Sequence, residues 1–214
     1  RCWSGAFAQA VALLQRLEAV DKDGRITAEG KAMAELPLHP RLAHMVHRAG
    51  ERGQGVLASN LAALLSERDV LSTRDPDIRS RLELLRGQSR TDVSRNRLNR
   101  VKAAARQIQR AGGSGDKDWT TAETGAVLAL AYPDRVAQRR GGGRYRFAGG
   151  GGGILDQTQA LASEAFLAVA DLDGSARDAR IYIAAPVSAA EIEEIFAAEI
   201  EDTEEVAWDS REQA

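Results

Sequence analysis

The sequence has 214 residues, of which 43% are apolar and 28% charged, so it can bury one large core or two small ones and is too apolar for disorder throughout. It contains no run of about 18 apolar residues and no basic-then-apolar start, which excludes a membrane-spanning helix and a signal peptide, and we expect a cytoplasmic protein. The single cysteine, Cys2, excludes an internal disulfide.

The net charge of −2 is small, but the charges are unevenly distributed along the chain. Residues 79–110 are strongly basic, whereas residues 191–212 are strongly acidic. Nearly all the positive charge is arginine, whose guanidinium group stays ionised and can hold a phosphate through two hydrogen bonds. The basic segment is therefore a candidate phosphate-binding surface, and the acidic end is expected to cover a basic surface of its own chain or of a neighbouring domain.

The first 40 residues have the pattern of a small winged helix. Apolar residues at helical spacing predict a first helix over Ala6–Leu17. Asp23-Gly24 is a turn dipeptide followed by a short β-prone stretch. Thr27 can then cap a second helix over Ala28–Glu35, and Pro40 can begin a third. Helix, wing-like turn and helix are the expected order.

Further helices are predicted up to residue 131, and one is expected to be amphipathic. They cover Arg41–Ala49, the amphipathic Val56–Leu65, Asp75–Leu85, Val93–Arg110 and Thr121–Ala131. Asp75-Pro76-Asp77 opens the third of these helices, and a capping box at Thr120-x-x-Glu123 opens the last.

The helix predicted over Val93–Arg110 carries two separate stripes. Its apolar seam consists of Leu98, Val101, Ala105 and Ile108. A polar stripe about 120° round the helix, free of acids, consists of Arg95, Asn99, Lys102, Arg106 and Arg110. This stripe is a candidate surface for a nucleic-acid backbone, gripped without sequence recognition. A merely solvated face is the alternative.

From Tyr132 the pattern changes to short β-prone runs, including Phe166–Leu172 and Ala179–Ala185. Arg144–Phe147 alternates basic and aromatic residues, so a strand would place its arginines on one face and its rings on the other. Arginine beside aromatic rings is typical of single-strand binding surfaces, although the ring face could equally be core. The candidate residues here are Arg135, Arg139, Arg140, Arg144, Tyr145 and Arg146.

The short strands and their composition predict a small OB-like barrel. An ordinary hairpin with a solvated rim is the alternative. Gly149–Gly153 lacks the Lys-Ser/Thr of a phosphate-binding loop and is expected to be a mobile hairpin tip. Ser188-x-x-Glu191 is a capping box that predicts a final helix over Ala189–Ile200, followed by the acidic, strand-like Glu204–Trp208.

Catalytic motifs are missing from the sequence. It has no phosphate-binding Gly-x-x-x-x-Gly-Lys-Ser/Thr, no Asp-Glu-Ala-His box and no Ser-His-Asp grouping, so we expect no ATP hydrolysis by this segment and no cofactor in it. His39, His44 and His47 are close in sequence, but a proline after His39 leaves only two of them on one helix, and zinc sites usually need three or four ligands.

Three stretches resemble the helicase-associated region of DEAH-box RNA helicases, and most of all that of the bacterial HrpB type. They are Val20–Met45 (VDKDGRITAEGKAMAELPLHPRLAHM), Ala63-Leu64-Leu65-Ser66, and Ala131–Arg140 (AYPDRVAQRR) with the glycines and tyrosine that follow. The segments Phe166–Asp173 and Arg180–Pro186 with the acidic end resemble the C-terminal extension of the HrpB type.

The resemblance implies an α+β chain with four parts: a winged helix (1–40), a helical ratchet-like bundle (41–131), the start of an OB-like β domain (132–160), and a C-terminal extension that completes the β domain (161–214). It implies an accessory part of an ATP-dependent RNA helicase, in which the ratchet helix and the hairpin together line a channel for single-stranded RNA, with single-stranded DNA as the alternative. The RecA-like motor domains that bind ATP and Mg would lie elsewhere in the same polypeptide, because a chain beginning at Arg1 is expected to be part of a longer protein.

Two other functions remain open from the sequence. A winged helix can bind duplex DNA, although Ala28–Leu36 carries Lys31 as its only cation, too little charge for a recognition helix. A protein-interaction scaffold without nucleic-acid contact is the second alternative.

Overall fold

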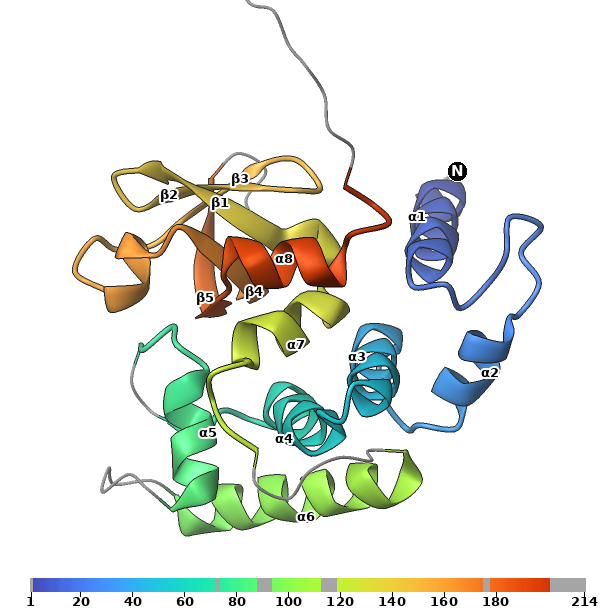
Figure 1. The fold of residues 1–214 in the computed structure, drawn as a ribbon, viewed down its shortest axis with the longest axis horizontal. Coiled ribbons are helices and arrows are strands. Elements are labelled where there is room, and N and C mark those ends of the chain that lie inside the picture. Colours follow the sequence, from blue (N-terminus) through green and yellow to red (C-terminus); the bar gives the residue numbers. More distant parts are fainter. Residues whose placement is uncertain (1, 72–73, 88–93, 113–118, 175–177, 201–214) are drawn as a thin grey trace, which may run out of the picture.

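The computed structural model describes residues 2–71, 74–87, 94–112, 119–174 and 178–200. Helices α1 to α7 come first in the chain, a closed β-barrel follows, and helix α8 packs beside the barrel (Figure 1). The helices and the barrel are stacked, with α7 between the other helices and strand β4. None of the helices in the described part is long and apolar enough to cross a membrane.

The predicted helix–turn–helix at the N-terminus is confirmed. Helix α1 spans Cys2–Arg16 and α2 spans Ala28–Ala34. The Thr27 hydroxyl accepts a hydrogen bond from the backbone N–H of Gly30, as an N-cap residue should. Gly30 has no room for a side chain, because a Cβ there would lie 2.0 Å from the carbonyl oxygen of Ala19. This close approach fixes the start of α2 against the end of α1.

The helix predicted over Val56–Leu65 is present, but the prediction that it is amphipathic is wrong. Helix α3 spans Pro40–Glu51, and α4 spans Gly55–Ser66 with every residue from Leu57 to Leu64 buried. The cause is tertiary: α4 contacts α3, α5, α6 and α7, so it has no solvent face. A helix that is apolar all round belongs in the core.

The segment Asp75–Asp77 does not begin a helix as predicted; α5 spans Arg79–Arg86. Asp77 instead forms a parallel bridge with Ala184 of the barrel. The Ala184 N–H donates to the Pro76 carbonyl at 2.8 Å, and the Ile78 N–H donates to the Ala184 carbonyl at 3.0 Å. These backbone bonds join the helical bundle to the barrel at the edge of the last strand.

Helix α6 spans Arg95–Ala111, in agreement with the prediction, and α7 spans Thr124–Ala131. The predicted capping box at Thr120 and Glu123 is wrong, because Glu123 makes no side-chain cap hydrogen bond. Helix α7 is buried throughout, and a Cβ on Gly125 would lie 1.9 Å from the Pro186 carbonyl oxygen. Glycine is needed there because α7 lies directly on the barrel backbone.

The barrel closes in the strand order β1-β2-β3-β5-β4. Its strands span Val136–Gly141 (β1), Arg144–Phe147 (β2), Gly152–Ile154 (β3), Phe166–Leu172 (β4) and Asp178–Pro186 (β5). All neighbouring pairs are antiparallel except β3 and β5. Short 3-10 turns lie at Pro133–Arg135 and Ala160–Ser163.

Strand β3 lies in the stretch that we expected to be only a hairpin tip. The tip is formed by Gly150 and Gly151, which have positive φ angles, and the next residues pair with β2 and β5. At Gly153 a Cβ would lie 2.6 Å from the Phe147 ring and 2.9 Å from Ile181. The glycine leaves space for these core side chains.

Helix α8 spans Ala189–Ile195, and the predicted capping box is confirmed, since the side chains of Ser188 and Glu191 each bond the other's backbone N–H. The helix ends before the predicted Ile200. The acidic stretch at Glu204–Trp208 lies outside the described residues.

Candidate nucleic-acid interface

The polar stripe on α6 faces solvent. Val101, Ala105 and Ile108 of the predicted apolar seam are buried, and Leu98 is half-buried. The polar stripe consists of Arg95, Asn99, Arg106 and Arg110, all exposed, and the half-buried Lys102. Arg97 lies on the buried side and donates to the Asp69 carbonyl oxygen at 3.1 Å. Within the described residues no ion pair involves the stripe, so its charges are available to a ligand.

The hairpin of β1 and β2 presents a second set of exposed arginines. Arg139, Arg140, Arg144 and Arg146 are all exposed, and Gln138 pairs across the strands with Arg146. Gly141 to Gly143 make the turn with positive φ angles. Arg144 and Arg146 point outward while Tyr145 and Phe147 point inward, as the alternation predicts.

Tyr145 does not belong to the binding surface that the sequence predicted. Its side chain lies in the barrel core with 2% exposure. Its hydroxyl lies 2.7 Å from the carbonyl oxygen of Leu161 and 2.9 Å from that of Glu164. Burial also raises the pKa of this phenol. The ring face of β2 is core, the alternative that the alternation left open, so Tyr145 cannot stack on a base.

Arg135 is held in a structural contact. It donates to the Ala170 carbonyl oxygen at 2.8 Å, and its guanidinium carbon lies 5.1 Å from the centre of the Tyr132 ring. Arg41 lies over the same ring at 5.3 Å. Arg135 therefore helps to join the strand β4 to the end of α7 and is a weaker candidate for nucleic-acid contact than the four exposed arginines.

The two arginine surfaces lie at opposite ends of the molecule (Figure 1). Helix α6 runs along the bottom of the view, and the β1–β2 hairpin lies at the top, with α4, α7 and the body of the barrel between them. The sequence led us to expect that they form one wall together. The fold does not bring them together, because α4 and α7 separate α6 from the barrel.

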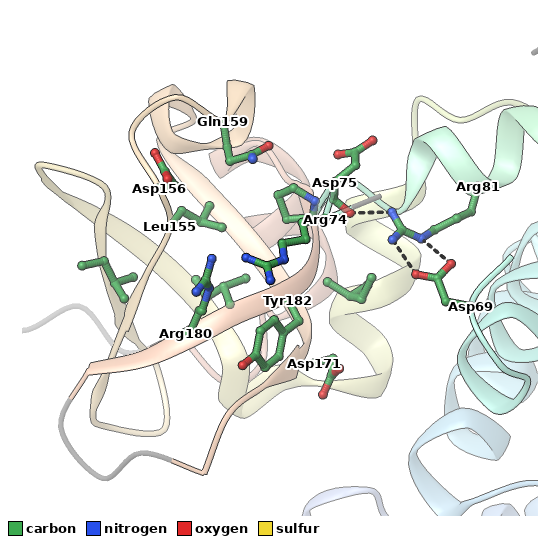
Figure 2. A pocket seen from close by; sticks show the side chains of 14 residues that line it. Asp69, Arg74, Asp75, Arg81, Leu155, Asp156, Gln159, Asp171, Arg180 and Tyr182 are labelled. Carbon is green, nitrogen blue, oxygen red and sulfur yellow. Dashed lines mark hydrogen bonds and ion pairs between the residues drawn. The ribbon is translucent and has the colours of Figure 1, made fainter. Parts of the chain in front are cut away.

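A pocket of about 500 Å³ lies between the bundle and the barrel (Figure 2). One wall comes from residues 69, 74–76 and 81, and the other from the outer face of β5 and from residues 154–159. Arg74, Arg180 and Tyr182 line it, and all three are exposed. None of the three was among the candidates that the sequence indicated, because Arg180-Ile181-Tyr182 places its basic and aromatic residues on one face of a strand, whereas Arg144–Phe147 alternates them between two faces.

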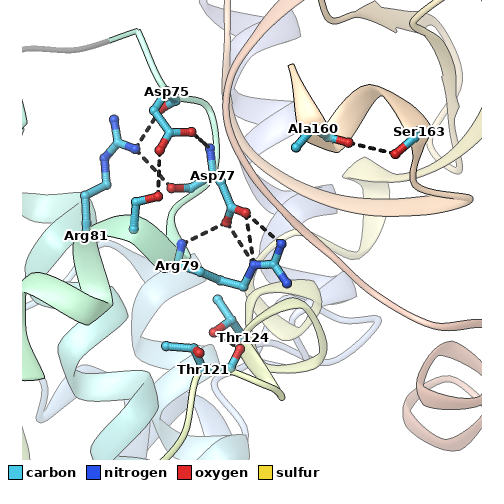
Figure 3. A network of polar contacts seen from close by, with 9 residues as sticks. Asp75, Asp77, Arg79, Arg81, Thr121, Thr124, Ala160 and Ser163 are labelled. Carbon is cyan, nitrogen blue, oxygen red and sulfur yellow. Dashed lines mark hydrogen bonds and ion pairs between the residues drawn. The ribbon is translucent and has the colours of Figure 1, made fainter. Parts of the chain in front are cut away.

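Arg81 holds the bundle side of this pocket in place. Its guanidinium is 4% exposed and pairs with the Asp69 carboxylate at 2.7 Å. It also donates to the backbone carbonyls of Asp75 at 2.7 Å and Asp77 at 3.1 Å (Figure 3). Arg79 beside it pairs with Asp77 at 2.7 Å, and this hydrogen bonding raises the Arg79 pKa. A buried guanidinium that bonds two carbonyls of one irregular segment keeps that segment in one conformation.

The histidines do not form a metal site. His44 is buried with Nδ1 at 2.8 Å from the Leu130 carbonyl oxygen, the His39 side chain accepts from the Arg41 N–H, and His47 lies 3.9 Å from Glu51. Across the part of the chain that the structure describes, no group of three or more His, Cys, Asp or Glu is placed to hold a metal ion.

Comparisons with known proteins agree with this architecture. The family model "Helicase associated domain (HA2), winged-helix" matches residues 10–38. The ATP-dependent RNA helicase HrpB of Escherichia coli (strain K12) is 34% identical over 200 residues, which are 92% of this chain and 23% of that protein.

Two crystal structures of Escherichia coli HrpB have the same fold. One, described as a DExH-box NTPase, aligns with a TM-score of 0.73 and 31% identity over 95% of this chain and 24% of that chain. The other, described as a DEAH/RHA helicase, aligns with a TM-score of 0.67 and 28% identity over 86% of this chain and 22% of that chain.

These matches identify the chain as the C-terminal helicase-associated region of a DEAH-box helicase. Within that class it is of the bacterial HrpB type. The chain spans about a quarter of the length of the relatives that it matches.

Proposed function

We propose that this chain is an accessory part of an ATP-dependent RNA helicase and that it holds single-stranded RNA by its sugar–phosphate backbone. The observation that carries the proposal is the presence of exposed arginines without ion-pair partners among the described residues, on α6 and on the β1–β2 hairpin, in a chain of the HrpB type. Guanidinium groups in this state release counterions when they bind phosphate and need no base recognition.

In this proposal the chain does no chemistry of its own. RecA-like motor domains outside the segment bind ATP and Mg and move the RNA, while this region keeps hold of the strand between steps. The barrel acts as an OB-like domain, a function supported by its five strands, its closed order and its arginine-rich hairpin. The proposal includes a cytoplasmic location, which is supported by the match to an RNA helicase.

The separation of α6 from the hairpin shapes this proposal. Two arginine surfaces at opposite ends of the molecule support contact with two separate stretches of one strand. RNA bound at one surface is held at a high effective concentration near the other. Loss of one surface should therefore weaken binding by more than the free energy of the contacts at that surface.

The test is the salt dependence of RNA binding by the chain. A variant with Arg95, Lys102, Arg139 and Arg140 all changed to glutamine should bind a single-stranded RNA oligonucleotide more weakly. For single strands each lost phosphate contact lowers the slope of log affinity against log salt by about 0.7, so we expect the slope to fall by up to about 3. Fluorescence anisotropy at several salt concentrations measures both quantities.

A matched control removes four charges from the winged-helix region, by changing Arg16, Lys22, Arg25 and Lys31 to glutamine. All four are exposed, and this variant should keep the wild-type RNA affinity and salt slope. If the control variant loses binding to duplex DNA that the wild type prefers over RNA, the chain is a winged-helix DNA-binding module instead. If the α6 and hairpin substitutions change neither affinity nor slope, a protein-interaction scaffold replaces the proposal.

A further inference from the structure

The chain has three tyrosines, and they lie in different environments. Tyr145 is buried in the barrel core, and Tyr132 has guanidinium groups over its ring. Tyr182 is 47% exposed, on the outer face of β5 at the pocket between bundle and barrel (Figure 2). A large ring left half open at the mouth of a pocket costs hydrophobic free energy that a stacked ligand would recover.

Arginines accompany this ring on both walls of the pocket. Arg180 and Tyr182 are outward positions two residues apart on β5, which places them about 7 Å apart along the strand. Arg74 comes from the bundle side, and Figure 2 shows its guanidinium group on the same side of β5 as that of Arg180. Within the described residues neither guanidinium forms an ion pair, so the two form a place for an anion beside an open ring.

The remaining charges of the pocket limit what can bind. Asp69 pairs with Arg81, and the Asp75 carboxylate accepts hydrogen bonds from the Ser80 hydroxyl and the Asp77 N–H. Asp156 and Asp171 lie at the rim. Four carboxylates and three arginines line the pocket, so its net charge is not positive and it would not bind every phosphate group. A ligand must offer both an aromatic face for Tyr182 and a single anion for Arg74 and Arg180.

A nucleotide within a single strand has these two features, and its base can direct amino groups towards the carboxylates at the rim. We infer that the pocket between bundle and barrel binds one nucleotide of single-stranded RNA, with the base stacked on Tyr182 and the adjacent phosphate between Arg74 and Arg180. The inference rests on the proposed function, since it names a subsite for the same RNA. Helix α5 and strand β5, which both contribute residues to the pocket, lie between α6 and the β1–β2 hairpin in Figure 1.

The site differs from the arginine surfaces in the kind of energy that it supplies. Stacking on an aromatic side chain contributes mainly non-ionic free energy, whereas the α6 stripe and the hairpin act through counterion release. Loss of the Tyr182 ring should therefore lower affinity and leave the salt slope unchanged. This difference separates the subsite from the rest of the proposed interface.

The experiment compares Tyr182→Ala and Tyr182→Leu with the wild-type chain in RNA binding at several salt concentrations. Both variants should bind single-stranded RNA about tenfold or more weakly with an unchanged salt slope, and Tyr182→Trp should bind at least as well as the wild type. Phe7→Ala is the matched control, because Phe7 is 71% exposed on α1 outside the pocket, and its loss should leave affinity unchanged. Circular dichroism checks that each variant is folded.

Ultraviolet crosslinking gives a second readout. RNA bound to the wild-type chain should form an adduct at Tyr182, found by mass spectrometry in the tryptic peptide that begins at Ile181. If the wild type binds RNA with a steep salt slope while both Tyr182 variants bind equally well and no adduct forms there, the inference is overturned and the proposed function stands. If the wild-type chain does not bind RNA, both are overturned.

Discussion

Arg41 and Asp134 form a two-pronged ion pair between the start of α3 and the turn that leads into the barrel. Arg41 donates to the two carboxylate oxygens at 2.6 and 2.9 Å and also to the Ala131 carbonyl at 3.0 Å. Their side chains are 12% and 21% exposed. The pair ties the first residues of the bundle to the end of α7 and thereby sets the position of the barrel.

Removing one member of this pair should destabilise the protein strongly. In Asp134→Asn the amide cannot accept both guanidinium hydrogen bonds, and the largely buried charge of Arg41 loses its partner. We expect a loss of about 2–4 kcal/mol in the free energy of unfolding, measured by urea denaturation. Arg25→Ala breaks the Arg25–Asp23 pair, whose side chains are 76% and 70% exposed, and should cost under about 1 kcal/mol. Equal effects of the two substitutions would contradict a structural role for the pair.

The same pair predicts a loss of stability in acid. Burial raises the pKa of Asp134, but the hydrogen bonds and charge of Arg41 outweigh burial and hold the pKa below its ordinary value. A carboxyl whose pKa is lower in the folded state stabilises the fold above its unfolded pKa, about 3.9, and loses that contribution as pH falls through the folded pKa. Asp134→Asn should therefore flatten the dependence of unfolding free energy on pH below about 4. An unchanged slope there would mean that other carboxyls account for the acid sensitivity.

The buried His44 should make stability depend on pH in a second range, higher than that of Asp134. Burial lowers its pKa below 6.5, assisted by Arg48 and His47 and opposed by its bond to Leu130 and by Glu18. The Leu130 carbonyl can only accept, so Nδ1 carries the proton of the neutral ring. Between the folded pKa and 6.5 the unfolded chain binds more protons, so stability should fall as the pH is lowered through 6.5 towards the folded pKa. His44→Gln should remove this part of the pH dependence in urea titrations, and a persistent slope would assign it to another group.

Local patterns in the sequence predicted the elements that have one buried side. The seam of α6 and the alternation of β2 are visible because solvent covers the other face, and Thr27 and Ser188 could be identified because capping depends on nearby residues. The burial of helix α4 on all sides could not be predicted, because it comes from four neighbouring helices. Strand β3 was missed because its glycines have no strand preference and are selected by the crowded core at Gly153.

The binding pocket could not be predicted from local patterns. Arg74 and Tyr182 are far apart in sequence and meet because Asp77 pairs with Ala184 at the edge of β5. The sequence showed that arginines beside aromatic rings were present, but it could not show which tyrosine has an open ring. Tyr145 lies between two exposed arginines and Tyr182 between two isoleucines, and closure of the barrel places the first ring inside and the second outside.

Gly125 offers a test of how closely α7 packs on the barrel. In Gly125→Ala the new methyl group would lie 1.9 Å from the Pro186 carbonyl oxygen, so helix and strand must separate. We expect a loss of about 3 kcal/mol in unfolding free energy, at the upper end of overpacking effects. Gly5→Ala on α1 meets nothing within 4 Å and should be neutral or stabilising by up to about 1 kcal/mol. A neutral Gly125→Ala would show that α7 does not lie against β5 as described.

Tyr145→Phe separates the structural role of this residue from the RNA-binding role that its sequence context predicted. The substitution removes the hydroxyl that bonds the Leu161 and Glu164 carbonyls but keeps the ring in the barrel core. Leaving these acceptors without their donor should cost about 1–2 kcal/mol of unfolding free energy in urea denaturation. RNA affinity should not change under conditions where the variant is fully folded.

Tyr182→Phe, the matched change on the exposed face, should leave stability unchanged, because its ring projects into the pocket mouth. A fall in RNA affinity for folded Tyr145→Phe would return Tyr145 to the binding surface, which would require the hairpin to open when RNA binds.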